Sequence, residues 1–200
     1  RLRLISSRVD GCESLRTRFP QAEVLEADLY HEETLLPVLE GVERIFMNVP
    51  DMLDERRATP NLISAISSAG TSPPILRFCA FPPHKSFRDV TKITQASGIG
   101  AAKHYIAKEA LDASDLDVTY LNAPCWFMTN LPWPSADALR AFQCLNIPHQ
   151  HSTTWISPND IGEAAASVLL DDKKNLDKEE GITGPDGVYF HRLAACMRRF

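Results

Sequence analysis

The sequence predicts an α/β fold with a doubly wound, mostly parallel β-sheet. Short apolar runs alternate with amphipathic stretches over the first 130 residues. The last part of this alternation, residues 104–130, places a helix, a short polar link and a strand before a loop rich in aromatic residues. Alternating strands and helices favour a parallel sheet with helices on both faces. Ligands bind such sheets at the carboxyl ends of the strands.

The composition excludes several classes of protein. The 200 residues are 44% hydrophobic and 24% charged, as is typical of one compact domain. A net charge of -5 argues against direct binding to nucleic acid. No apolar run approaches the roughly 20 residues of a membrane span, and no signal peptide opens the chain, so we expect a cytoplasmic protein without membrane contact. The five cysteines are scattered, and the histidines lack further ligands at suitable spacing, so no metal site is expected.

Each predicted element follows from the local pattern. Apolar runs bounded by polar residues predict strands at residues 2–5, 23–26, 44–49, 75–80 and 118–121. Apolar residues at helical spacing predict helices at residues 11–18, 32–39 and 61–69, and a long helix that begins near residue 99. Gly41 and Gly70 end two of these helices. A polar loop at residues 82–94 follows the fourth strand.

The last 70 residues depart from this alternation. Residues 131–158 are rich in proline and polar residues, with one short helix predicted at 135–144. We then expect a helix at 160–170, a charged loop at 171–180 and a terminal helix near Arg192. This part is predicted to be a smaller region on the substrate side of the protein.

Several segments, in order, resemble the NmrA-like family of atypical short-chain dehydrogenase/reductases. The loop Leu-Asn-Ala-Pro-Cys-Trp-Phe-Met-Thr-Asn at residues 121–130 is similar to the family's LRPxxFMEN motif. Residues 155–165 resemble its wvdvrDIGevAA segment, and residues 182–185 its LTGP element. The resemblance implies an NAD(P)-binding Rossmann-like domain over residues 1–130 and a substrate-side region over residues 131–200.

One part of the expected nucleotide site is absent from the sequence. No GxGxxG or GxxGxxG motif occurs, and the first predicted strand already begins at Leu2. We therefore predict a Rossmann-like fold that lacks the first strand and the Gly-rich turn that holds a pyrophosphate. The substrate-side region also ends early, at Phe200. Two interpretations stay open: a fragment of a longer chain, or a protein that has lost dinucleotide binding.

The residues after the first strand predict NADP(H) as the cofactor. Ser7 and Arg8 follow this strand, and no acidic residue occurs before Asp10. A hydroxyl group and a guanidinium suit the 2′-phosphate of NADP, whereas NAD is recognised by an acidic residue. The alternative is a turn followed by a solvated charge.

The resemblance implies further cofactor contacts after the other strands. Asp28, followed by Leu29, would contact the adenine amino group; alternatively Asp28 caps the next helix. The remaining residues lie along the ribose groups and the nicotinamide ring. They are Val49 and Pro50 at the adenosine ribose, Ala80 and Phe81 at the nicotinamide ribose, and Ala123, Pro124 and Cys125 at the ring.

The catalytic candidates are His104 and Lys108. The usual Tyr-Lys pair of short-chain dehydrogenases is four residues apart, whereas Tyr105 and Lys108 are three apart and out of register. His104 and Lys108 are four apart and share one helix face. The resemblance places His104, which also belongs to the cofactor site, where relatives carry Lys or His. Its imidazole could act as a general acid or could orient the nicotinamide ribose.

Four aromatic residues are predicted to border a pocket for a small apolar molecule, although they could instead be core residues. They are Trp126, Phe127, Trp133 and Trp155. The resemblance implies an NADP(H)-dependent reductase of a small apolar carbonyl, imine or activated alkene. The alternatives are an NAD(P)-sensing regulator that contacts a protein partner without turnover, and a non-redox isomerase or cyclase that uses the same pocket. Asn122 departs from the family motif, which has Arg at this position.

Overall fold

The computed structural model describes residues 1–50, 52–81, 87–89, 92, 101–124, 126–127, 152–170 and 178–189. The chain divides into two compact units. The first comprises Arg1–Arg77 and His84–Thr119, and the second Phe78–Pro83 and Tyr120–Phe200. Two strands, β4 (Ile75–Cys79) and β5 (Val118–Asn122), begin in the first unit and end in the second. The domain boundary at residue 130 stays a prediction.

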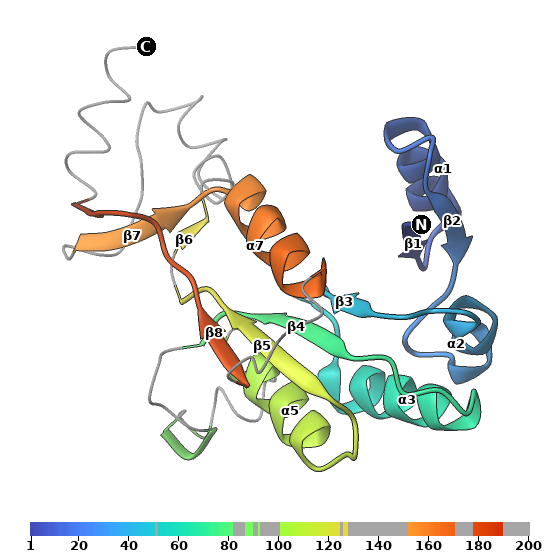
Figure 1. Cartoon of the computed structure of the whole chain (residues 1–200). Helices are drawn as coiled ribbons and strands as arrows, with labels where there is room; N and C mark the ends of the chain where they lie inside the picture. The colour runs from blue at the N-terminus through green and yellow to red at the C-terminus, as the bar shows by residue number, and fades with distance from the viewer. Residues whose placement is uncertain are drawn as a thin grey trace. The chain divides into compact units, whose positions relative to one another are not determined.

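The first unit consists of alternating strands and helices (Figure 1). In chain order it contains β1 (Arg3–Ser6), α1 (Val9–Arg18), β2 (Glu23–Glu26), α2 (Glu32–Leu39), β3 (Ile45–Met47), α3 (Glu55–Ser68), the start of β4 (Ile75–Cys79), the 3-10 turn η1 (Phe87–Asp89), α5 (Ala101–Asp112) and the start of β5 (Val118–Asn122). β1 pairs in parallel with β2, and β3 with β4. These parallel pairs with intervening helices confirm the predicted α/β fold class.

Two glycines end helices where the sequence predicts it. Gly41, after α2, has φ 67°, and Gly70, after α3, has φ 64°. This left-handed conformation is strained for residues that carry a Cβ, and glycine adopts it readily.

The predicted start of α3 at residue 61 is wrong, because the helix begins at Glu55. The Asp54 carboxylate accepts a hydrogen bond from the Arg56 backbone N–H, which caps the first turn. Ala58 and Thr59 are fully buried, and this packing offsets the hydrogen bond that Pro60 cannot make. Proline within the first two turns therefore did not mark the helix boundary.

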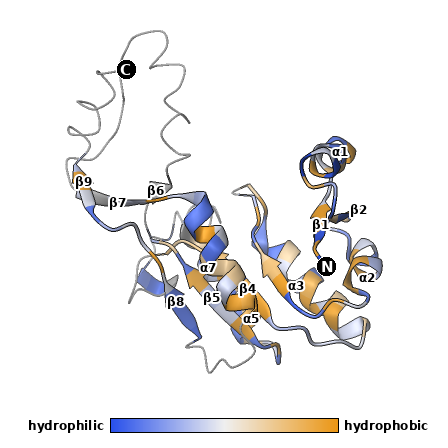
Figure 2. Cartoon of the chain, turned by 45° about the horizontal axis from the view of Figure 1, so that its top comes forward, coloured by the Kyte–Doolittle hydropathy of each residue, from blue (hydrophilic) through white to orange (hydrophobic). Residues whose placement is uncertain are grey.

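The core of the first unit lies between its helices and the start of β4. α2 packs on α3, and α3 packs on α5. Figure 2 shows hydrophobic residues on α3 and α5 and along β4. On α5, Lys103 and Tyr105 are buried, whereas Ile106 and Ala110 are partly exposed.

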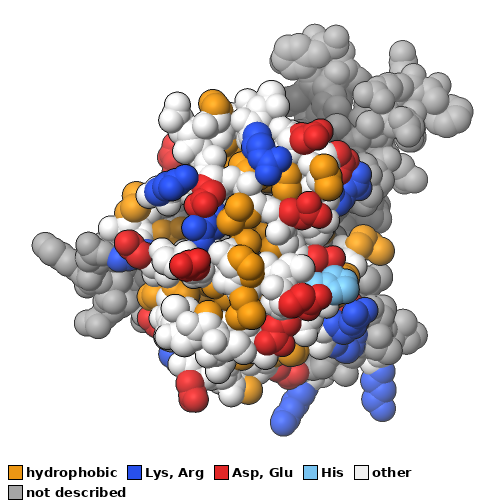
Figure 3. All heavy atoms as spheres, turned by 90° about the vertical axis from the view of Figure 1, so that its right-hand side faces the viewer, with side chains coloured by type: hydrophobic (Ala, Val, Ile, Leu, Met, Phe, Trp, Pro, Cys, Tyr) orange, Lys and Arg blue, Asp and Glu red, His pale blue; other side chains and the backbone are white. Residues whose placement is uncertain are grey.

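The strands of the first unit do not form one continuous sheet. β1 and β2 form a two-stranded sheet, separate from the sheet that contains β3 and β4. A complete doubly wound fold has the strand order 3-2-1-4-5, so its first strand lies between the pair 3-2 and the pair 4-5. Here β2 and β1 correspond to the first of these pairs, and β3 and β4 to the second. No described strand occupies the position between them. Large hydrophobic side chains, including Ile5 of β1 and Phe46 of β3, are exposed. Figure 3 shows hydrophobic side chains in the middle of one face, among charged groups.

The second unit contains the ends of β4 and β5 and a set of short elements. These are β6 (Trp126–Phe127), β7 (Ser152–Ile156), α7 (Pro158–Leu170), β8 (Glu179–Gly181) and β9 (Gly187–Tyr189). β8 pairs in parallel with β5, β6 pairs in parallel with β7, and β9 pairs antiparallel with β7. The helix predicted at 160–170 is confirmed and begins two residues earlier. The helices predicted at 135–144 and near Arg192 lie outside the described residues.

Candidate cofactor site

The carboxyl ends of β1 and β2 lie side by side in the first unit. The Ala27 N–H donates to the Ser6 carbonyl oxygen at 3.1 Å, just beyond the two strands. The Ser6 hydroxyl oxygen accepts from the Arg8 N–H at 3.2 Å. A Cβ on Gly11 would lie 2.3 Å from this hydroxyl oxygen, so glycine allows α1 to begin close to β1. The predicted residues Ser7, Arg8 and Asp28 therefore follow neighbouring strand ends.

Arg8 is exposed at this edge and pairs with Asp10. Its Nε donates to Asp10 Oδ1 at 2.9 Å, and its Nη2 donates to Asp10 Oδ2. The hydrogen bond from Arg8 holds the pKa of the Asp10 carboxyl below its usual value, and the same bond raises the pKa of Arg8. The guanidinium is thus positively charged, accessible and able to bind an anion in place of the Asp10 carboxylate.

Asp28 shapes the turn after β2. Its Oδ1 accepts from the Tyr30 N–H at 2.9 Å, and its own N–H donates to Thr34 Oγ1 at 2.9 Å. The alternative role for Asp28, as the cap of the next helix, is wrong because His31 is the N-cap of α2. The carboxylate instead forms an Asx turn and remains half-buried at the edge of the sheet.

Tyr30 connects this turn to the chain after β3. Its hydroxyl oxygen accepts from the Asp54 N–H at 2.7 Å, and the Arg57 guanidinium lies 4.7 Å from the centre of its ring. Leu29 is held by its backbone, since its carbonyl accepts from Asn61 Nδ2 at 2.9 Å. The turn after β2 is therefore linked by hydrogen bonds to the N-cap and the body of α3, with a cation–π contact beside it.

Val49 and Pro50 accept hydrogen bonds from a residue that the prediction missed. Lys103, in the first turn of α5, donates from Nζ to the Val49 carbonyl at 3.4 Å and to the Pro50 carbonyl at 3.1 Å. One signal was available in the sequence. Lys103, Ala107 and Leu111 are four residues apart in turn, so they share a helix face. The burial of Ala107 and Leu111 also places Lys103 in the protein interior.

The two catalytic candidates lie on α5 of the first unit. His104 is half-buried, and its Nδ1 is shielded from solvent. Lys108 Nζ donates to Asp112 Oδ2 at 2.9 Å, one turn further from His104. The catalytic roles of His104 and Lys108 stay predictions.

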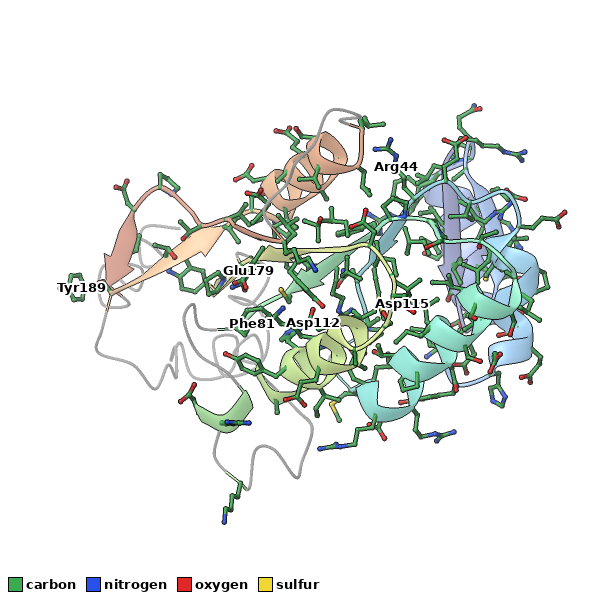
Figure 4. All side chains as sticks on the ribbon, turned by 60° about the horizontal axis from the view of Figure 1, so that its bottom comes forward. Arg44, Phe81, Asp112, Asp115, Glu179 and Tyr189 are labelled. Atoms are coloured by element: carbon green, nitrogen blue, oxygen red, sulfur yellow. The ribbon has the colours of Figure 1, made fainter. Side chains whose placement is uncertain are left out.

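In the second unit, Asn122 holds the chain that leaves β4. Its side chain is 2% exposed. Oδ1 accepts from the Phe81 N–H, and Nδ2 donates to the Phe81 carbonyl and to Glu179 Oε1, all at 3.1 Å. Figure 4 labels Phe81 and Glu179. Asn122 therefore has a structural function: its side-chain amide fixes Phe81 and ties β5 to β8.

The other residues predicted at the nicotinamide are also in the second unit. The Ala123 N–H donates to the Cys79 carbonyl at 2.9 Å, which brings the end of β5 beside that of β4. Ala80 is half-buried, and Pro124 is exposed. Cys125 lies outside the described residues.

Of the four aromatic residues predicted to border the pocket, only Trp155 lies fully within the described residues. The Trp155 side chain is 8% exposed, and its backbone pairs with that of Trp126 across β7 and β6. The side chains of Trp126 and Phe127, and the whole of Trp133, lie outside the described residues. The pocket stays a prediction.

Among the described residues, no helix is long and apolar enough to cross a membrane. In the same part of the chain, no group of three or more His, Cys, Asp or Glu residues could hold a metal ion.

The fold is that of Rossmann-like NAD(P)-binding proteins. Similar solved structures are a nucleoside-diphosphate-sugar epimerase from Staphylococcus aureus (17% identity, TM-score 0.71), a triphenylmethane reductase from Citrobacter sp. complexed with NADP(H) (16%, 0.69) and an NADPH-dependent quinone oxidoreductase from Escherichia coli complexed with NADPH (18%, 0.71). Each comparison covers 98% of this chain, but 66%, 65% and 65% of the other chains, just under two thirds of their length. No family model and no curated protein matches the sequence.

Proposed function

We propose that this chain binds NADP(H) and acts as a reductase on a small apolar carbonyl, imine or activated alkene. The observation that carries the proposal is the exposed Arg8 guanidinium just after the carboxyl end of β1, where it pairs with Asp10. The Arg8 backbone N–H donates to the Ser6 hydroxyl oxygen, and the Ser6 carbonyl oxygen accepts from Ala27 at the end of β2. Guanidinium and hydroxyl groups are the donors that a 2′-phosphate requires. Two of the similar structures contain NADP(H) or NADPH, which supports this choice of cofactor.

Residues of the first unit have separate roles in this proposal. Arg8 and Ser7 hold the 2′-phosphate, and the Asp28 carboxylate accepts a hydrogen bond from the adenine amino group. The backbone of Val49 and Pro50 borders the adenosine ribose. Bound NADPH supplies a hydride. The His104 imidazole acts as the general acid and donates a proton to the substrate that accepts the hydride.

The Arg8→Ala variant tests the cofactor proposal. We expect its dissociation constant for NADPH to rise about tenfold, the loss of roughly one charge-assisted hydrogen bond, with no change for NADH. Fluorescence titration with both cofactors measures the difference. Asp10→Asn is the matched variant, because it removes the carboxylate that competes for Arg8, and it should bind NADPH more tightly. Equal weakening of both cofactors in Arg8→Ala would show that Arg8 does not recognise the phosphate.

The His104→Ala variant tests the role in proton transfer. We expect kcat to fall by about 100-fold while NADPH still binds, because a positioned general acid contributes roughly this factor. Consumption of NADPH is followed with a panel of carbonyl, imine and enone substrates. Glu109→Ala, an exposed change on the same helix, is the control and should retain full activity. Full turnover by His104→Ala would contradict the proposal, and tight NADPH binding without turnover by the unmodified protein would favour the sensor.

A further inference from the structure

A buried lysine at the start of α5 holds the segment Met47–Pro50, which we call the β3 exit. Lys103 is 1% exposed. Two of its acceptors are the carbonyl oxygens of Val49 and Pro50, at 3.4 and 3.1 Å. Removing an ammonium group from water is costly unless polar groups replace the water. The carbonyl dipoles of the β3 exit therefore stabilise this charge, and the charge in turn fixes their direction.

A second buried cation binds the same segment from another element. Arg77 of β4 is 1% exposed, and its Nη1 donates to the Met47 carbonyl at 3.4 Å. The other terminal nitrogen of this guanidinium, Nη2, pairs with Glu55 at the start of α3. Cations on α5 and β4 thus bind carbonyl oxygens at both ends of the β3 exit, which is a stronger restraint than a loop turn alone would supply.

The restraint determines which backbone groups the β3 exit can offer to a ligand. In a planar trans peptide the C=O and N–H groups point in opposite directions. With the Met47 carbonyl directed at Arg77, the Asn48 N–H points away from Arg77, and the Asn48 side chain is exposed. The β3 exit also lies at the carboxyl end of a parallel strand, where ligands of such sheets bind.

We infer that Lys103 is a positioning residue for the cofactor. It holds the β3 exit in the conformation that borders the adenosine ribose, and it acts through the Val49 and Pro50 carbonyls without touching the cofactor. This inference rests on the proposed function, and it adds a residue for which that function had no role.

The Lys103→Met variant tests the inference with two separate measurements on the whole chain. Without nucleotide, hydrogen exchange at the Asn48 and Val49 amides should be about tenfold faster, as expected for the loss of about one hydrogen bond. With nucleotide, the KM for NADPH should rise about tenfold while kcat at saturating NADPH stays unchanged. Lys103→Arg keeps the charge and the donors and should restore part of both effects. Glu109→Gln on the same helix should change neither.

The possible results separate this inference from the proposed function. Faster exchange together with a higher KM supports both. Unchanged exchange in Lys103→Met overturns the inference, and so does faster exchange with an unchanged KM. If the unmodified protein binds no NADPH, the proposed function itself fails and the cofactor role of Lys103 fails with it. Circular dichroism checks folding, and Lys103→Gln, which retains a donor, replaces the methionine variant if that variant unfolds.

Discussion

Replacement of Glu55 by alanine is expected to lower the free energy of unfolding by about 3–5 kcal/mol. Glu55 and Arg77 form a buried ion pair, with side chains 0% and 1% exposed. Thr59 Oγ1 donates to the second carboxylate oxygen of Glu55 at 2.6 Å. Alanine would leave the Arg77 guanidinium buried without its counter-charge, which is the costly way to break such a pair. Urea denaturation followed by circular dichroism measures the change.

Two further variants show whether charge is the cause. Glu13→Ala removes an exposed carboxylate from the same unit and should change stability by less than about 0.5 kcal/mol. Combining Glu55→Leu with Arg77→Met removes both charges and should recover most of the loss, since apolar pairs of similar volume often replace buried ion pairs. A double variant as unstable as Glu55→Ala would mean that packing, and not the unpaired charge, accounts for the effect.

Replacement of Gly184 by alanine is expected to destabilise the second unit by about 3 kcal/mol. A Cβ at this position would lie 1.8 Å from the Trp155 carbonyl oxygen and 2.7 Å from its carbonyl carbon. These are backbone atoms of β7, so no side-chain rotation can relieve the overlap. Limited proteolysis with mass spectrometry, carried out in increasing urea, identifies the unit that opens.

Gly162 is the matched position for this experiment. It lies within α7, and a Cβ added there would meet no neighbouring atom within 4 Å, so Gly162→Ala should stabilise the helix by about 0.5–1 kcal/mol. Opposite effects at two glycines of one unit would identify close packing as the cause at Gly184. A Gly184→Ala variant as stable as the unmodified protein would contradict the close packing of Gly184 against the β7 backbone.

The parts of the fold that could be predicted have strong local patterns. β1, β2 and α2 have runs of four to eight residues with clear periodicity, and the predicted bounds lie within one residue of those observed. β6, β8 and β9 contain two or three residues each, too few to show a period, and their partners lie far away in the sequence. Their pairing with β7 and β5 depends on tertiary contacts.

The residues of the candidate site also differ in whether the sequence alone could suggest them. Arg8 and Asp28 could be proposed as cofactor residues because each lies shortly after a predicted strand, and strand ends are where α/β proteins bind ligands. Lys103 and Asn122 were missed as contributors. Each is a polar residue in a buried position, and its role depends on a backbone group more than 40 residues away, Pro50 and Phe81 respectively. Nothing in the local pattern identifies such a partner.

For this protein, the order and type of the main elements follow from the amino-acid sequence, because apolar periodicity and helix-ending glycines act over a few residues. The tertiary structure decides which polar groups are buried together. Glu55, Arg77 and Lys103 are polar in the sequence and would each be expected at the surface. They are buried because the fold supplies a carboxylate for Arg77 and backbone carbonyls for Lys103, and those partners come from distant elements.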